Sequence, residues 1–340
     1  MSLLHKIPGI ASFAVFKGSA SGRIVEATTH RALNPDSVVV KITHSGLCFT
    51  DFLFRKKDMV LGHEGVGIVE SVGPACKHLK PGERVGWSYV QDTCGHCDMC
   101  YQGEDMYCPE AALYGTSNLD VGSLASHAVI KESFLFLVPR AIELVHAGPL
   151  FCGGATVFEA LTRYGVKPGD RVGVVGVGGL GHLAIQFAAK MGCEVIVFSS
   201  TESKREEALQ LGAAEFHAVK GAQTLAQVKP INCLLSTTNT QPDWKMYLDI
   251  MAPKGTIFPL TVMGDLEGFP SLPVTMKGIT VQGSCVSPRS VVRKMLDFAA
   301  RHGVRPVVQT YPMTRGGIEE ALEALREGKV RYRGVLVAQD

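Results

Sequence analysis

Four cysteines lie close together and form the densest group of metal-binding side chains in the sequence. Their spacing is C-x2-C-x2-C-x7-C, and the residues are Cys94, Cys97, Cys100 and Cys108. Four thiolates satisfy the tetrahedral coordination of zinc and leave no position open, which is typical of a structural site. An iron–sulfur cluster is the alternative, but the bacterial ferredoxin pattern has three residues before its last cysteine, where this segment has seven. The spacing therefore favours structural zinc.

A second group of possible metal ligands is dispersed along the chain. Cys48 lies in Gly-Leu-Cys-Phe-Thr-Asp, His63 and Glu64 lie in Gly-His-Glu-Gly, and Cys152 lies in Phe-Cys-Gly-Gly. Two thiolates and one imidazole would leave the fourth position of zinc open for water or a substrate oxygen. Glu64 is a candidate for an exchangeable fourth ligand, and Asp51 for an outer residue that orients a ligand. A lone cysteine on an apolar segment is usually a small core residue, so spacing alone leaves both interpretations open.

A glycine-rich turn lies between an expected strand and an expected helix. The apolar run 171–175 leads into Gly-Val-Gly-Gly-Leu-Gly, which has the spacing G-x-G-x-x-G and precedes the helical run 182–190. In this context the motif binds the pyrophosphate of a dinucleotide at the N-terminus of the helix. The expected cofactor contacts in the turn are Gly176, Gly178, Gly179, Leu180 and Gly181.

The end of the next strand indicates which dinucleotide binds. An NAD site carries a carboxylate about 20 residues past the motif, whereas this chain has Ser199 and Ser200 there. Small hydroxyl side chains with Lys204 and Arg205 close by suit the 2′-phosphate of NADPH. Glu202 is a nearby carboxylate that could indicate NAD instead. We place it in the first turn of the next helix, where the helix dipole favours a carboxylate. The alternative is that the two cations are solvated helix charges.

The elements that would hold these residues change along the chain. Residues 1–150 contain short β-type runs broken by glycine and proline, which are typical of an irregular, mostly antiparallel β domain. From 151 to 285, apolar strands alternate with helices, and this favours a parallel sheet covered by helices. Segment 286–340 ends in the apolar strand 334–338, which we expect to return to the first domain. The expected fold class is α/β, with a dinucleotide-binding unit inserted into a β-rich domain.

Composition and charge narrow the class of protein. The 340 residues include 34 Lys and Arg against 32 Asp and Glu, for a formal net charge of +2, and neither half carries a run of like charges. We therefore expect no nucleic-acid partner and no membrane partner. No stretch of about 20 apolar residues and no signal-peptide pattern occurs. The predicted location is therefore the cytoplasm, a reducing compartment in which clustered cysteines indicate a metal site before disulfides.

Taken in order, these motifs resemble the zinc-containing medium-chain alcohol dehydrogenase family over essentially the whole chain. The stretch Ser-Ser-Thr-Glu-Ser-Lys at 199–204 resembles the cinnamyl alcohol dehydrogenase-like branch, whose members use NADPH and reduce aldehydes. The resemblance implies a GroES-like β-rich catalytic domain and a Rossmann domain with a doubly wound parallel sheet. It also suggests a homodimer, by analogy with the family.

The resemblance implies roles for individual residues. Cys48, His63 and Cys152 would hold the catalytic zinc, with Glu64 as the adjacent carboxylate. Thr50 would complete the catalytic set, as the hydroxyl that starts a proton relay through the cofactor ribose. Three further positions match family contacts to the cofactor: Thr156 and Ser284 at the nicotinamide end, and Arg331 as the candidate for the pyrophosphate.

Two departures from the branch concern proton delivery and the substrate pocket. Leu53 stands where a relay histidine is common, and Phe49 replaces the common histidine after the first cysteine ligand. Only ten residues, Phe52 to Leu61, separate Asp51 from Gly62, so we expect a wider or more exposed pocket. The expected pocket residues are Phe49, Phe52, Trp87 and Val90. Each of these side chains could equally belong to the core.

The predicted function is hydride transfer between NADPH and a small aldehyde or primary alcohol, with one catalytic and one structural zinc. The resemblance implies that zinc polarises the carbonyl oxygen, that the nicotinamide delivers hydride, and that Thr50 supplies the proton. One alternative is reduction of an iminium or an activated C=C bond, which needs less proton management and fits the missing histidine. The other is a non-catalytic cofactor-binding protein, against which the intact set of Cys48, His63 and Cys152 argues.

Overall fold

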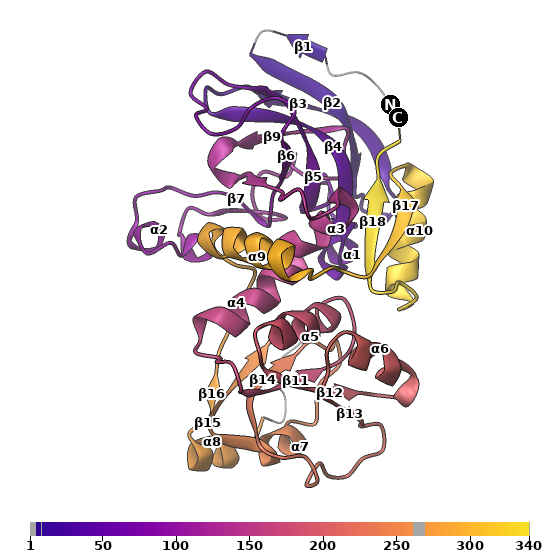
Figure 1. Ribbon diagram of the computed structural model, residues 1–340. Helices are drawn as coiled ribbons and strands as arrows, with labels where there is room; N and C mark the ends of the chain where they lie inside the picture. Colours follow the sequence, from indigo (N-terminus) through magenta and orange to yellow (C-terminus); the bar gives the residue numbers. More distant parts are fainter. Residues whose placement is uncertain (1–4, 8, 261–268, 340) are drawn as a thin grey trace. The chain divides into compact units, whose positions relative to one another are not determined.

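The chain forms two structural units, and the first is built from both ends of the sequence. The computed structural model describes residues 5–7, 9–260 and 269–339. One unit comprises Met1–Cys152 with Pro288–Asp340, and the other is the continuous stretch Gly153–Ser287 (Figure 1). The chain therefore leaves the first unit once and returns to it after the second is complete.

The first unit is mainly antiparallel β-structure. Within the described residues, a three-stranded sheet contains β1 (His5–Ile7), β2 (Ile10–Lys17) and β3 (Val25–Ala32). A larger sheet has the order β10-β6-β5-β4-β18-β17, and β9 also pairs with β4. Its strands are β4 (Ser37–Leu47), β5 (Glu64–Val72), β6 (Arg84–Gly86), β9 (His127–Lys131), β10 (Phe136–Leu137), β17 (Val308–Pro312) and β18 (Arg333–Val337). A small separate sheet pairs β7 (Val90–Asp92) with β8 (Ala112–Leu113).

The C-terminal strand β18 enters the larger sheet beside β4. Gly334 of β18 lies opposite Leu47 of β4, in an antiparallel pair. On the other side of β4, Gly46 lies opposite Glu64 of β5. The end of β4 is therefore flanked by residues that lie about 270 positions apart in the sequence, and this register positions the candidate metal site.

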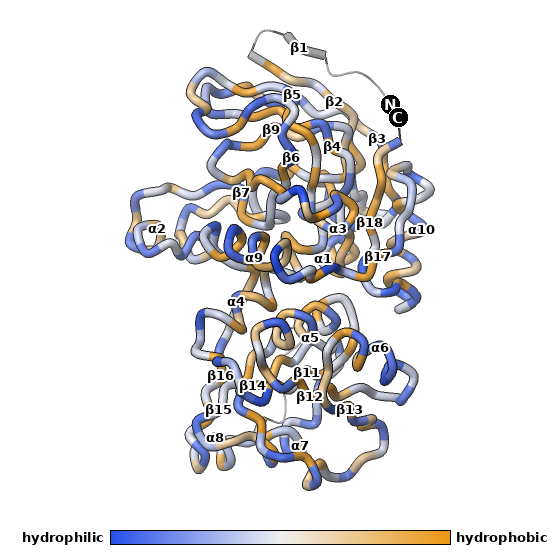
Figure 2. Tube along the Cα trace, in the orientation of Figure 1, coloured by the Kyte–Doolittle hydropathy of each residue, from blue (hydrophilic) through white to orange (hydrophobic). Residues whose placement is uncertain are grey.

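Short helices connect the strands of the first unit and cover its core. They are α1 (Phe49–Phe54), α2 (Asp98–Tyr101), α3 (Leu144–Pro149), α9 (Arg289–His302) and α10 (Arg315–Arg326), with 3-10 turns at Asp105–Tyr107 and Glu132–Phe134. One face of α10 joins the strands in a single core, where Ile318 and Leu322 pack in the same cluster as Phe13 and Val40. In Figure 2, hydrophobic residues, coloured orange, recur along the strands of the first unit.

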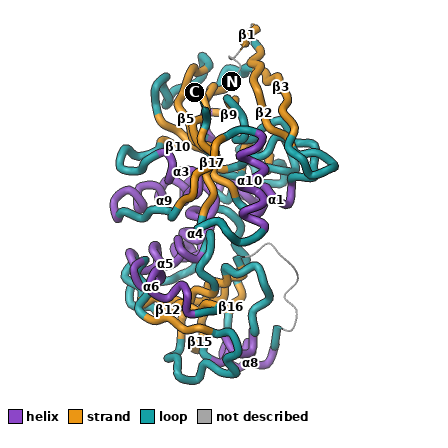
Figure 3. The backbone as a smooth tube through the Cα atoms, turned by 90° about the vertical axis from the view of Figure 1, so that its right-hand side faces the viewer, coloured by secondary structure: helices purple, strands orange, loops and turns teal. Residues whose placement is uncertain are grey.

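The second unit is a parallel sheet with helices. Its order over the described residues is β13-β12-β11-β14-β15-β16, and β11 pairs in parallel with both β12 and β14. The strands are β11 (Arg171–Val175), β12 (Glu194–Ser199), β13 (Glu215–Ala218), β14 (Ile231–Ser236), β15 (Met251–Pro259) and β16 (Thr280–Val281). The helices are α4 (Ala155–Arg163), α5 (Gly181–Lys190), α6 (Arg205–Gln210), α7 (Trp244–Asp249) and α8 (Ser271–Lys277), with a 3-10 turn at Glu202–Lys204 (Figure 3). The strand order reverses at β11, and ligands bind at such switch points in doubly wound sheets.

One helical run of the described chain is long and apolar enough to cross a bilayer by length and composition alone. It extends over 20 residues, Leu144–Arg163, and 78% of its most apolar window is buried inside the protein. It includes α3, a π-helical turn at Leu150–Gly154, and α4. This burial identifies the run as a core helix, because a membrane span would present its apolar side chains to lipid.

Candidate functional site

The dispersed metal ligands meet in the first unit. Cys48 caps α1 directly after β4, and Cys152 lies in the π-helical turn after α3. Glu64 begins β5, and His63 immediately precedes it. The Nε2 atom of His63 lies 3.3 Å from the Cys48 sulfur and 3.4 Å from the Cys152 sulfur. With Glu64 included, the four ligand atoms lie within 4.8 Å of one another. Because tetrahedral zinc holds sulfur and nitrogen ligands about 3.5 Å apart, this donor set fits the ion.

Asp51 orients the histidine of this set. Its Oδ1 accepts a hydrogen bond from His63 Nδ1 at 3.1 Å, and its Oδ2 accepts one from the backbone N–H of Cys48 at 3.0 Å. Since the proton then resides on Nδ1, the lone pair of Nε2 is directed to the two sulfurs. Asp51 is completely buried, so these hydrogen bonds are protected from water.

The electrostatics favour a thiolate at Cys48. A hydrogen bond from Cys152 holds the pKa of the Cys48 thiol well below its usual value, and the same contact raises the pKa of Cys152. Burial by itself lowers the pKa of His63, but the Cys48 thiolate and the Asp51 carboxylate raise it well above the ordinary value. The thiolate is the form of cysteine that binds zinc, and this site already favours one.

Glu64 forms a buried ion pair with Arg333 of β18. Burial raises the pKa of Glu64 to about 7, although the guanidinium of Arg333 opposes that rise. The second carboxylate oxygen, Oε2, has no hydrogen-bond partner among the described residues. A Cβ atom at Gly46 would collide with Oε2, so the neighbouring strand leaves room for the carboxylate only because that position is glycine. Arg331, the expected cofactor arginine, is exposed instead, two residues away.

Helix α1 carries the expected proton donor and part of the expected pocket. Thr50 is half-buried, whereas Leu53 is 46% exposed. The rings of Phe49 and Phe52 lie 5.2 Å apart, and the guanidinium of Arg55 lies 4.1 Å from the Phe52 ring centroid. The other two expected pocket residues, Trp87 and Val90, are buried in the hydrophobic core of the unit.

The four clustered cysteines also converge. Their sulfur atoms lie within 4.8 Å of one another, with 3.6 Å between Cys94 and Cys108 and 3.9 Å between Cys94 and Cys100. A disulfide requires about 2.05 Å, whereas thiolates around a tetrahedral zinc lie about 3.8 Å apart. All four are free thiols, so the arrangement fits a closed zinc site. The Nδ1 atom of His96 lies 2.8 Å from the carbonyl oxygen of Cys94.

An ion pair anchors this cysteine lobe to the returning chain. Asp105, between the third and fourth cysteines, is 2% exposed. It accepts hydrogen bonds from the backbone N–H, Nε and Nη2 of Arg289 at 2.9, 3.0 and 2.9 Å. Arg289 is the first residue of α9 and also lies 4.4 Å from the Phe134 ring centroid. Asp105 therefore caps the helix with which the chain re-enters the first unit.

The glycine-rich turn lies in the second unit, between β11 and α5. Gly176 has a φ of +92°, which an L side chain rarely adopts. A Cβ atom at Gly181 would collide with the carbonyl oxygen of Gly176, so close packing requires the last glycine. At Gly178 a Cβ atom would meet nothing within 4 Å. Since the protein's own packing does not need that glycine, the open space beside it fits a pyrophosphate; Gly179 and Leu180 complete the turn.

The residues expected at the 2′-phosphate lie beside this turn. Ser199 ends β12 and is buried, and Ser200 follows it and is exposed. The Nζ atom of Lys204 donates a hydrogen bond to the carbonyl oxygen of Val177 at 2.5 Å.

Two other predicted cofactor residues are also in the second unit: Thr156 is buried in α4, and Ser284 follows β16 with a buried hydroxyl that has no partner among the described residues.

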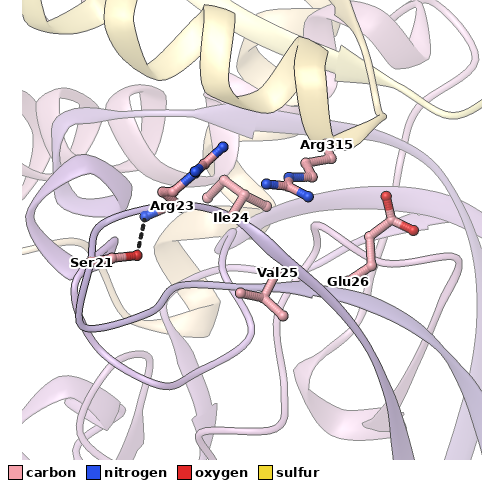
Figure 4. A pocket seen from close by; sticks show the side chains of 6 residues that line it. All are labelled: Ser21, Arg23, Ile24, Val25, Glu26 and Arg315. Atoms are coloured by element: carbon pink, nitrogen blue, oxygen red, sulfur yellow. Dashed lines mark hydrogen bonds between the residues drawn. The ribbon is translucent and has the colours of Figure 1, made fainter.

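A surface pocket of about 510 Å³ lies elsewhere on the first unit. Figure 4 shows its lining residues, which come from β3, the segment before it and the start of α10: Ser21, Arg23, Ile24, Val25, Glu26 and Arg315. All of these except Ile24 are exposed. The pocket contains none of the predicted site residues.

Two residues of the metal site were not indicated by any sequence motif. Arg333 contacts Glu64 from the C-terminal strand. Tyr114 donates a hydrogen bond from its hydroxyl to Asp51 Oδ1 at 2.9 Å. Arg333 lies 269 residues from its partner, and Tyr114 lies 63 residues from Asp51. Neither has a local spacing that could have revealed it.

Comparisons with known proteins agree with this arrangement. Residues 34–140 match the model of the alcohol dehydrogenase GroES-like domain, and residues 179–301 match that of the zinc-binding dehydrogenases. An aldehyde reductase from Synechocystis is 33% identical over 315 residues, which are 90% of this chain and 92% of that protein. The chain belongs to the zinc-containing medium-chain alcohol dehydrogenase family.

Solved structures place this alcohol dehydrogenase near the cinnamyl alcohol dehydrogenases. The enzyme from Sorghum bicolor superposes with a TM-score of 0.88 at 30% identity, covering 96% of this chain and 97% of that one. CAD from Helicobacter pylori, solved with NADP(H), gives a TM-score of 0.85 at 26% identity, with coverage of 96% and 98%. The expected GroES-like and Rossmann fold is confirmed. The protein is an oxidoreductase of the alcohol and aldehyde dehydrogenase type.

Proposed function

We propose that this protein is a zinc enzyme that uses NADPH to reduce an aldehyde to a primary alcohol and that catalyses the reverse oxidation. The observation that carries the proposal is the buried convergence of Cys48, His63 and Cys152, three donors that leave a position of zinc for a substrate oxygen. The aldehyde reductase and cinnamyl alcohol dehydrogenase among the relatives support the substrate class.

In this proposal, one unit carries the catalytic residues and the other binds the cofactor. Met1–Cys152 with Pro288–Asp340 forms the catalytic domain, and Gly153–Ser287 binds NADPH. When bound, zinc polarises the substrate oxygen and NADPH supplies the hydride. Asp51 accepts the hydrogen bond of His63 Nδ1 and so directs Nε2 to the two sulfurs, and the hydroxyl of Thr50 moves the proton at the substrate oxygen. Hydride transfer then needs mainly orientation and electrostatics from the protein.

Glu64 is the exchangeable fourth ligand in this proposal. Its unpartnered Oε2 supports that role, because a carboxylate held by one ion pair retains a free oxygen. The buried guanidinium of Arg333 stabilises the ionised form. A water or substrate oxygen would displace Glu64 when the cycle begins.

The cysteine lobe binds a second, structural zinc. Cys94, Cys97, Cys100 and Cys108 supply four sulfur donors and no open position. Six of the ten cysteines bind zinc in this proposal, and cysteines used as metal ligands are typical of a reducing compartment, here the cytoplasm.

NADPH, in preference to NADH, is the proposed cofactor. Lys204 lies half-buried with its ammonium group over the glycine-rich turn, where it can pair with a 2′-phosphate. Glu202 is already held by Arg205, which leaves no free carboxylate there for the ribose hydroxyls of NADH. The hydroxyls of Ser199 and Ser200 and the pyrophosphate turn 176–181 complete the site, while Thr156 and Ser284 serve the nicotinamide end.

A second candidate activity is reduction of an iminium or an activated C=C bond. The exposed position of Leu53 favours it, since the place of the common relay histidine is occupied by a side chain that cannot carry a proton. These acceptors depend less on delivery of a proton to a developing oxyanion. The metal site is the same in both candidates.

A homodimer through the second unit completes the proposal. Strand β16 is an edge of the parallel sheet, and the exposed fractions of Leu272 and Met276 on α8 and of Val281 on β16 are 70%, 76% and 38%. Exposed apolar side chains beside an open strand edge are typical of a subunit interface. Light scattering of the double variant Leu272→Glu, Met276→Lys should show a monomer; an unchanged mass would place the interface elsewhere.

The experiment that tests the metal proposal is Cys48→Ala. We expect two zinc ions per chain in the native protein and one in the variant, together with loss of aldehyde-dependent NADPH oxidation. Cys193→Ala is the control, because Cys193 belongs to the second unit and to neither sulfur cluster. If Cys48→Ala keeps both ions and full turnover, the assignment of the catalytic metal is wrong.

A further inference from the structure

Tyr114 lies directly behind the histidine of the proposed metal centre. It follows β8 and is completely buried. Its hydroxyl donates to Asp51 Oδ1 at 2.9 Å and accepts from the backbone N–H of Gly62 at 2.8 Å. Its ring lies beside that of His63, with 4.8 Å between centroids and 30° between planes. One side chain therefore contacts both the histidine and the carboxylate that orients it.

The Asp51 carboxylate is a junction of four hydrogen bonds. Oδ1 accepts from His63 Nδ1, the Tyr114 hydroxyl and Gly62 N–H, and Oδ2 accepts from Cys48 N–H. Three donors hold Oδ1 and one holds Oδ2, so rotation of the Asp51 side chain would break several hydrogen bonds at once. The Tyr114 hydroxyl is the one partner in this set that is neither next to a proposed ligand nor part of one.

Aromatic contacts restrict the imidazole from two sides. The Tyr114 ring is tilted by 30° to the His63 ring, and Tyr89 meets that ring edge-on, with 5.7 Å between centroids and 87° between planes. The two tyrosine rings also contact each other, with 5.9 Å between centroids. Rotation of the imidazole about its side-chain bonds would drive it into one of these rings.

We propose that Tyr114 is a positioning residue for the metal centre: through Asp51 and through its own ring, it holds His63 Nε2 at the metal. This inference rests on the proposed catalytic site. A purely structural role does not require the hydroxyl, because a phenylalanine fills the same volume and a buried hydroxyl must find partners. The partners found here are the residues that set the direction of the ligand.

The test is Tyr114→Phe in the full chain. We expect zinc to leave the Cys48 site for a chelator about ten times faster, as when other outer partners of a ligand are removed. The absorption spectrum of the cobalt-substituted enzyme should shift, and kcat should fall with little change in KM. Gly62 N–H still donates to Asp51, so the melting temperature should change little.

Tyr247→Phe is the matched control, because Tyr247 is a 2% exposed tyrosine in the core of the other unit. That variant should release zinc at the native rate with a native cobalt spectrum. Tyr114→Leu, which removes the ring as well, should release zinc faster than Tyr114→Phe. This second variant tests the ring contact, and zinc release no faster than in Tyr114→Phe would refute that part.

The inference is overturned if Tyr114→Phe releases zinc at the native rate and keeps the native cobalt spectrum. Failure of the proposed function looks different: the native protein would then hold no zinc that Cys48→Ala removes. If the variant melts far below the native protein, the spectrum of the folded fraction decides, and a native spectrum again refutes the inference.

Discussion

The ammonium group of Lys204 lies over the glycine-rich turn, with Nζ 2.5 Å from the carbonyl oxygen of Val177. Its neighbour Arg205 makes a different contact: Nε and Nη2 donate to the carboxylate of Glu202 at 2.5 and 3.0 Å. Two adjacent cations of the same helix start therefore have different environments. One is held at the proposed cofactor site, and the other is neutralised at the surface.

Replacing Lys204 should change the choice of cofactor. In Lys204→Ala we expect the Kd of NADPH to rise about tenfold, because the contact to the 2′-phosphate is lost. The Kd of NADH should barely change. Arg205→Ala is the control and should leave both constants near native values. Fluorescence titration with each cofactor gives the answer, and an equal loss for both would contradict the assignment.

Replacing Thr50 should separate the two candidate reactions. In Thr50→Ala, kcat/KM for an aldehyde should fall about a hundredfold, because positioned proton transfer contributes that much or more. Reduction of an iminium should be nearly unaffected, since no proton must reach an oxygen. Steady-state kinetics with both substrate classes measures the difference. Thr50→Ser, which keeps the hydroxyl, should recover aldehyde reduction.

Asp105 should contribute strongly to the stability of the first unit. Removing one partner of a buried pair leaves the other charge without compensation, so Asp105→Ala should lower the free energy of unfolding by about 2 kcal/mol. This loss is smaller than the roughly 3–5 kcal/mol for a fully buried pair, because the side chain of Arg289 is 32% exposed and water can solvate the unpaired guanidinium. Thermal unfolding measures the loss. In a double-mutant cycle, Asp105→Ala combined with Arg289→Met should cost less than the sum of the single changes.

Glu132 should make part of the stability depend on pH. Burial alone would raise its pKa, but the backbone N–H groups of Lys77, Leu79 and His78 lower it. Because the pKa of Glu132 is lower in the folded than in the unfolded protein, its ionised carboxylate stabilises the folded state. This stabilisation is fully present above the unfolded pKa of about 4.3 and is lost as the pH falls through the folded pKa. Glu132→Gln should therefore be about 1 kcal/mol less stable at neutral pH.

Urea unfolding of both proteins over a pH series checks this sign. The free energies of unfolding of the native protein and of Glu132→Gln should converge in acid, where the protonated carboxyl of Glu132 is uncharged, as the amide of glutamine is. Glu206→Gln is a suitable control, because Glu206 is exposed and belongs to the other unit. A difference that grows as the pH falls would contradict the prediction.

Local spacing determined two parts of the proposed machinery without any tertiary information. The four cysteines lie within fifteen residues, and the glycine-rich turn lies between one strand and one helix. In both cases the groups that must meet are neighbours in the chain, so the geometry of one loop or turn brings them together. Strands alternating with helices likewise predicted the parallel sheet of the second unit, because hydrophobic period depends on local sequence.

Only the tertiary structure brought together the residues of the open metal site. Cys48, His63 and Cys152 come from three separate elements, and their sequence spacing allowed a core role for each. The registers place Glu64 of β5 opposite Gly46 of β4, and Gly334 of β18 opposite Leu47. Arg333, the residue before Gly334, therefore lies close enough to pair with Glu64. Tyr114 reaches Asp51 across 63 residues. Such contacts depend on which strands pair and in which register, and these follow from burial over the whole domain.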